Sequence, residues 1–288
     1  MDRVRVNWTL TPDQFALAWS RTDGDRIPYP LAIRLSARDT GERAAQLPAL
    51  SGWCDRVLDA DLEAALRILA QPDLRVEVFG QQRDPVPIPH EPGPHWDSGP
   101  LAPPPTPEAE CGQAPSPPAR PVRILGAACG NIAVVAAQRP GPTPDRGDAV
   151  RLFVGSPKNL AARVVSTLPE NTPGTLPRLT APRAQVEEDS RGLVTVPVAG
   201  PSPSARIRKL LKQPREGIGQ IVVSARSGAG EPRPFGVLCW IDVVGDGRYA
   251  VRTGADVDIV AVTAEGFAAH LRPMVTAATH TITSYAER

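Results

Sequence analysis

The sequence contains few of the residues that form covalent cross-links or carry catalysis. Its 288 residues include four cysteines and four histidines, and 32 Lys and Arg nearly balance 31 Asp and Glu. The cysteines form no CxxC pair and have no regular spacing, which favours free thiols in a reducing compartment. A net charge of +1 provides no long-range field that would draw the protein to nucleic acid or anionic lipid. We therefore expect no nucleic-acid partner.

Long apolar runs are also missing. No stretch approaches the roughly 18–20 apolar residues that a membrane span needs, so we expect no membrane insertion. The first ten residues, MDRVRVNWTL, have no apolar segment followed by a small-residue cleavage site, and we expect no signal peptide. With the free thiols, these features predict a cytoplasmic protein.

Catalytic motifs are scarce as well. The sequence has no G-x-S-x-G elbow and no GxxxxGK[ST] loop. His90 and His95 lie in HEPGPHWD, a segment that proline keeps from forming the preorganised geometry of a metal site. His270 fits the flank of a helix. We predict no metal, no cofactor and no small-molecule substrate, and a protein that acts by binding rather than by catalysis.

Proline, in contrast, is abundant and unevenly placed. Of the 34 prolines, 14 fall in residues 81–121. Proline fixes φ and lacks an amide donor, so this stretch is predicted to be an exposed, polyproline-like insert. A second stretch, 169–201, is rich in Pro, Thr and charge and is predicted to be a linker between two halves of the chain.

Four segments have the sequence of a helix N-terminus. Thr11, Ser156 and Ser202 are hydroxyl N-caps that each precede a proline, and Thr263 precedes Glu265 in a first turn. Apolar residues at helical spacing predict helices over 58–69, 157–168, 203–211 and 264–275. The basic run ARIRKLLK (205–212) is either a solvated helix face or a phosphate-binding surface.

Strands are indicated by the alternation of apolar and polar residues and by turn sequences between apolar runs. Gly130-Asn131 and the GDG of 245–247 are turn signals between apolar runs. Asp242, Asp246 and Asp258 are interpreted as turn formers rather than paired acids. The predicted strands are 31–35, 74–79, 122–128, 132–138, 149–154, 220–225, 235–244 and 248–252.

An internal duplication organises these elements. Residues 66–79 and 207–225 both read as an amphipathic helix, then Gln-Pro, then a strand. This predicts an α+β fold with pseudo-two-fold symmetry, in which helices cover a central antiparallel β-sheet. The halves are 1–168 and 202–288, within one compact unit, and they are expected to differ in strand number and in the proline insert.

Several segments, in order, resemble the EspG family, the chaperones of type VII secretion. They are LTPDQFALAW (10–19), PYPLAI (28–33), ALRILAQPDLRVEV (65–78), VRILGAACGNIAVVAAQ (122–138) and GVLCWIDVVGDGRYAVR (236–252). The resemblance implies a cytosolic protein that binds a PE–PPE heterodimer at the helical tip of the PPE subunit, in a complex with one copy of each chain. It would keep the dimer soluble and direct it to the secretion machinery.

The resemblance also suggests residues that contact the partner. In segment 236–252 these are Leu238, Trp240, Arg248 and Tyr249, and in the insert they are Trp96 and Leu101. Trp240 is either a core residue or an interface anchor, and Arg248 and Tyr249 are either strand-surface residues or contacts. An unrecognised enzyme and a homo-oligomeric scaffold remain alternative functions.

Overall fold

The computed structural model describes residues 7–22, 24, 26–83, 118–188, 200–226 and 232–286, with the backbone alone for 283–286. The elements in chain order are β1 (Asn7–Leu10), α1 (Pro12–Thr22), α2 (Thr40–Val57), α3 (Ala60–Ala70), β2 (Leu74–Gln82), β3 (Arg120–Cys129), β4 (Ile132–Pro140), β5 (Gly147–Gly155), the 3-10 turn η1 (Pro157–Asn159), α4 (Leu160–Val165), β6 (Leu179–Pro182), α5 (Arg183–Glu187), α6 (Pro203–Leu211), β7 (Arg215–Ala225), β8 (Arg233–Val243), β9 (Gly247–Thr253), β10 (Asp256–Ala261) and α7 (Ala264–Ala286).

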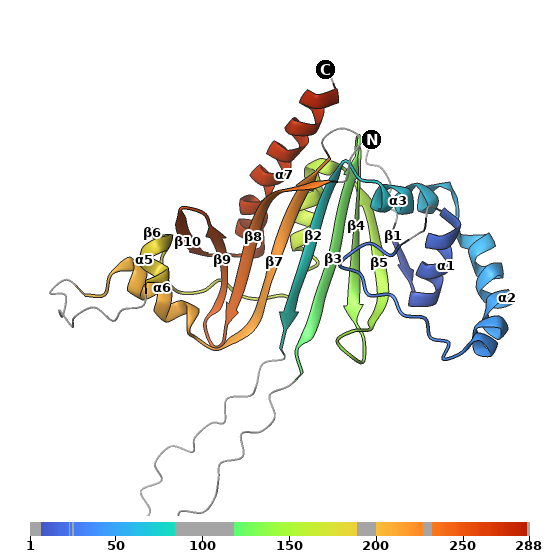
Figure 1. Ribbon diagram of the computed structural model, residues 1–288, viewed down its shortest axis with the longest axis horizontal. Coiled ribbons are helices and arrows are strands. Elements are labelled where there is room, and N and C mark those ends of the chain that lie inside the picture. The colour runs from blue at the N-terminus through green and yellow to red at the C-terminus, as the bar shows by residue number, and fades with distance from the viewer. Residues whose placement is uncertain are drawn as a thin grey trace, which may run out of the picture.

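The strands form one ten-stranded sheet in the order β1-β5-β4-β3-β2-β7-β8-β9-β10-β6, and every neighbouring pair is antiparallel (Figure 1). Outward from the central β2–β7 pair, the two halves have equivalent orders, β2-β3-β4-β5-β1 and β7-β8-β9-β10-β6. In the chain, α3 precedes β2 as α6 precedes β7, and α4 follows β5 as α7 follows β10. The predicted α+β, pseudo-two-fold sheet is confirmed. Within their predicted bounds, 1–168 and 202–288, the halves differ in strand number, with five and four described strands, and β6 from the stretch between them completes the second set.

The stretch expected to be a linker contains structure. β6 and α5 both lie within 169–201, and β6 pairs with β10 as β1 pairs with β5. β6 has only four residues and ends in proline, so the sequence carries no strand pattern there. Part of this stretch, 189–199, and most of the predicted insert, 84–117, fall outside the described residues.

The helix starts follow the predicted capping chemistry. Thr11 and Gln14 form a capping box, in which each side-chain oxygen accepts the backbone amide of the other residue at 3.3 and 2.9 Å. The Ser202 hydroxyl accepts from the amide of Ala205, and Thr263 caps α7. At Ser156 the cap opens the turn η1, which leads into α4.

The strands β1 and β10 have no counterpart among the predicted strands, and two further segments differ from the sequence prediction. Residues 31–35 are a loop rather than a strand, because the buried Gln138 amide satisfies both the N–H and the C=O of Ala32 at 2.8 and 3.1 Å. The helix α2 has only Cys54 buried and contains Pro48, so the sequence has no apolar stripe to indicate it.

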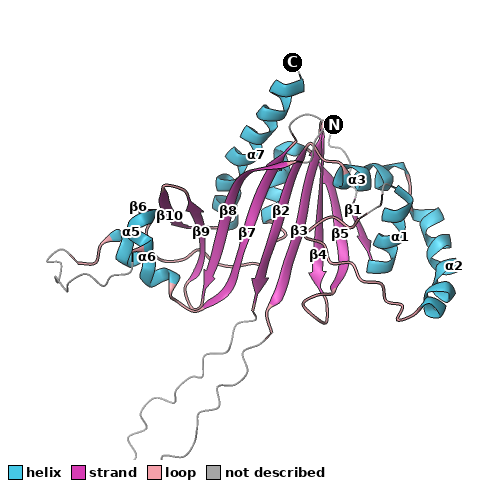
Figure 2. Ribbon diagram, in the orientation of Figure 1, coloured by secondary structure: helices cyan, strands magenta, loops and turns pink. Residues whose placement is uncertain are grey.

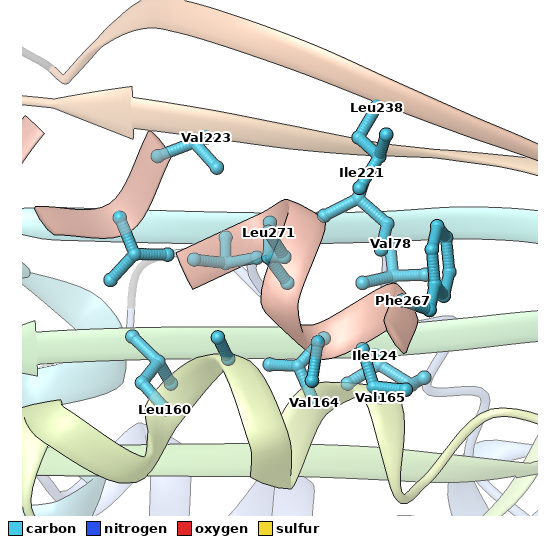
Figure 3. Close-up of a cluster of buried hydrophobic side chains, with 14 of the residues drawn as sticks. Val78, Ile124, Leu160, Val164, Val165, Ile221, Val223, Leu238, Phe267 and Leu271 are labelled. Carbon is cyan, nitrogen blue, oxygen red and sulfur yellow. The ribbon is translucent and has the colours of Figure 1, made fainter. Parts of the chain in front are cut away.

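The helices cover the two faces of the sheet unequally. The helices α4 and α7 pack on one face, which we call the α4/α7 face, and bury the largest apolar cluster (Figure 3). On the opposite face, α1–α3 cover β3–β5 and α6 covers β8–β10. Figure 2 shows helices at both ends of the sheet, whereas the central strands face the viewer uncovered. Within the described residues, no helix is long and apolar enough to span a bilayer.

Candidate protein-binding face

Trp240 lies at the centre of the core on the α4/α7 face. Its side chain is fully buried and meets Phe267 of α7 edge-on, with ring centroids 6.4 Å apart. Gly80 and Gly219 lie beneath the ring, where a Cβ would come within 2.7 and 2.1 Å of its carbon atoms. The glycines on β2 and β7 therefore form the space for the indole, and Leu238 is equally buried beside it.

Arg248 and Tyr249 are also buried, so their interpretation as strand-surface residues is wrong. The Arg248 guanidinium donates to both carboxylate oxygens of Asp242 at 2.7 and 2.8 Å, and neither side chain is more than 4% exposed. Asp242 is thus part of an ion pair, not a turn former. The Tyr249 hydroxyl donates to Asp246 and accepts from the amide of Leu176, which ties the 169–182 stretch to β9.

These positions give segment 236–252 a structural role. The buried ion pair, the indole and the tyrosine hold β7, β8, β9 and the 169–182 stretch together. Direct contact of Leu238, Trp240, Arg248 or Tyr249 with a partner stays a prediction. Trp96 and Leu101, the other predicted contacts, lie outside the described residues.

The centre of the opposite sheet face is open. Along β2 the burial alternates strictly, with Leu74, Val76 and Val78 buried and the intervening side chains half-buried. A similar alternation runs over residues 217–223 of β7 and 237–240 of β8. We call the partly exposed set the open sheet face: Arg75, Glu77, Phe79, Gln81, Ile218, Gln220, Val222, Val237 and Cys239.

The open sheet face combines apolar side chains with a few charges. Ile218 is 42% exposed and Val237 is 47% exposed, and the Tyr29 ring lies 6.0 Å from that of Phe79. Burial raises the pKa of the Glu77 carboxyl, and the Arg75 guanidinium, 4.0 Å away, opposes this. Such a surface, in which exposed apolar side chains lie among a few polar ones, resembles a protein interface in composition.

The described residues contain a cleft but no recognisable metal site. Among them, no group of three His, Cys, Asp or Glu side chains is placed to hold a metal ion. A cleft of about 1130 Å³ lies between α3, α4 and the ends of β4 and β5, and its charged lining residues are Asp61 and Arg163. Neither His nor Cys is among its lining residues.

A family model described as the EspG family matches residues 11–272. The chain belongs to the EspG family. The solved structures include a relative in fold, the Mycobacterium tuberculosis type VII secretion system chaperone EspG5, determined in complex with the PE25–PPE41 dimer. It is 16% identical, covers 97% of this chain and 96% of its own, and superposes with a TM-score of 0.54. No curated protein matches the chain.

Sequence reasoning did not find the open sheet face of this EspG-family protein. A signal was present in β7, where Ile218 stands between Gly217 and Gly219. The two glycines face the Asp242 carboxylate and the Trp240 ring on the α4/α7 side, so Ile218 must project from the other side of the strand. Recognising this requires knowledge of which side the helices cover.

Proposed function

We propose that this protein is a cytoplasmic, non-enzymatic chaperone of type VII secretion that binds a PE–PPE heterodimer and keeps it soluble. The match of the EspG family model to residues 11–272 carries the proposal. The similarity of fold to EspG5, whose structure contains a PE25–PPE41 dimer, agrees with it.

The physical purpose of such binding is to mask an apolar helical end. An exposed apolar patch of more than a few hundred Å² favours aggregation. A partner that binds only the soluble dimer withdraws it from self-association by mass action. A wide sheet with one uncovered region offers an extended, rigid surface for this purpose.

Co-expression with a PE–PPE pair tests the proposal. We expect a stable complex with one copy of each chain, identified by its mass in light scattering after size-exclusion chromatography, and less aggregation of the pair than without the chaperone. An unrelated helical heterodimer is the control and should elute separately. If the protein bound none of the PE–PPE pairs encoded beside its gene, the proposal would be contradicted. Turnover of a small molecule by the purified protein would contradict it as well.

The predicted contacts in the insert need their own test. Deletion of 84–118 should weaken cargo binding if Trp96 and Leu101 dock on the partner, at an ordering cost that lowers the affinity per contact. Unchanged affinity would show that the insert is dispensable for binding.

A further inference from the structure

Each half of the sheet has a corner at which its third strand from the centre begins and its fourth strand ends. In the first half, the last paired residues of β4 and β5 are Ala133 and Gly155. In the second half, the last paired residues of β9 and β10 are Tyr249 and Ala261. The cleft of about 1130 Å³ lies at the first corner, since Ala133 and Gly155 are among its lining residues. The second corner is therefore the counterpart of this cleft in the other half.

An extended piece of the chain fills the second corner. Pro173 forms a parallel bridge with Arg248 at the start of β9. The Arg248 amide donates to the carbonyl of Thr172 at 2.7 Å, and the Gly174 amide donates to the carbonyl of Arg248 at 3.1 Å. The corresponding space in the first half is the cleft. Its position in the fold is thus one that an extended peptide completes in the other half.

The lining of the cleft suits a peptide with apolar side chains. The helices α3 and α4 lie on opposite faces of the sheet (Figure 1). They contribute Ile68 and Leu160 to the lining, and Ile132 lies between them at the start of β4. Asn131 and Asn159 add side-chain amides, which can both donate to and accept from a peptide backbone.

Two arginines flank Phe153, which also lines the cleft. The guanidinium carbons of Arg163 and Arg151 lie 4.9 and 5.3 Å from the centroid of its ring. In the part of the chain that the structure describes, neither arginine forms an ion pair. A guanidinium that stacks on a ring still presents its N–H groups at its edge, where they can bind a carboxylate. The Phe153 side of the cleft therefore favours a negatively charged group.

We propose that this cleft is a second protein-binding site, which takes an extended segment of another protein that carries apolar side chains and a carboxylate. The segment pairs with the start of β4 as residues 171–176 pair with β9, and its carboxylate accepts hydrogen bonds from Arg163. A strand that adds to a sheet gains affinity from main-chain hydrogen bonds and specificity from side-chain pockets. The cleft shares no residue with the open sheet face, so this site is independent of the proposed cargo binding.

Fluorescence anisotropy with two labelled octapeptides tests the proposal on the full 288-residue chain. One probe alternates valine with aspartate and the other alternates valine with lysine, so that they differ in charge. We expect the aspartate probe to bind at least about tenfold more tightly than the lysine probe, and Arg163→Gln to weaken its binding about tenfold, as expected for the loss of a hydrogen bond to a charged group. Arg272→Gln makes the same change in charge at an exposed position of α7 and should bind within about twofold of the wild type.

A steric variant tests the location of the site. Ala64 of α3 is exposed and lines the cleft, so Ala64→Trp should block the aspartate probe while the melting temperature stays close to that of the wild type. Ala44→Trp, at an exposed position of α2 outside the cleft, is the matched control and should leave the affinity unchanged.

Four results would overturn the proposal. They are wild-type affinity of Arg163→Gln or of Ala64→Trp for the aspartate probe, equal affinity of the wild type for both probes, and no detectable binding of either. A variant that lacks residues 1–6, which precede the lining residue Asn7, should bind the aspartate probe as the wild type does. Markedly tighter binding by this variant would make the chain's own segment the occupant and would also overturn the proposal.

Discussion

Replacement of Trp240 by alanine distinguishes a core residue from an interface anchor. The side chain is fully buried on two glycines and against Phe267, so its removal leaves a cavity that rigid sheet backbone cannot close. Large aromatic-to-alanine changes in cores cost about 3–5 kcal/mol. For a chain of this size each kcal/mol lowers the melting temperature by about 2–4 °C, which gives an expected decrease of about 6–20 °C.

The assay is unfolding by heat and by urea, followed by circular dichroism, together with cargo affinity at a temperature where the variant is folded. Val237→Ala is the matched control, because Val237 lies on the same strand but is 47% exposed. It should change the unfolding free energy by less than about 0.5 kcal/mol. Trp240→Phe keeps part of the aromatic volume and should fall between the wild type and the alanine variant.

One result would refute this reasoning. If Trp240→Ala unfolded within about 1 kcal/mol of the wild type and lost only its affinity for cargo, then Trp240 would contact the partner. The core position would be wrong, and segment 236–252 would have to move on binding.

Three further predictions follow from the same contacts. Asp242→Asn should destabilise the fold by about 3–5 kcal/mol in urea unfolding because Arg248 keeps a buried, uncompensated charge; the double variant D242L/R248M should cost less than the sum of the single changes, and an additive cost would argue against the pair. Gly219→Ala should cost about 1–3 kcal/mol because its Cβ would lie 2.1 Å from the Trp240 ring; unchanged stability would contradict the packing. Since burial raises the folded-state pKa of Glu77, its ionisation opposes folding. Glu77→Gln should therefore raise the unfolding free energy at pH 7. This gain should vanish below about pH 4, where Glu77 is protonated in both the folded and the unfolded protein. A gain that persists at low pH would show that burial of the ionised carboxylate is not its cause.

Local signals in the sequence determined many elements. Hydroxyl caps before proline began α1 and α6, and alternating apolar residues with glycine turns fixed β3, β4, β8 and β9. The repeated helix, Gln-Pro and strand at 66–79 and 207–225 predicted the duplication. These features depend on residues a few positions apart, so they can be read without the fold.

Tertiary structure decided what lies on each side of the sheet. Alternation along β2 and β7 shows that two faces differ, but helices distant in the chain determine which face is buried. For the same reason Arg248 and Tyr249, which resemble surface residues in a strand, are enclosed by Asp242 and the 169–182 stretch. The central strands expose apolar side chains on the open sheet face because α4 and α7 cover only the opposite side of these strands.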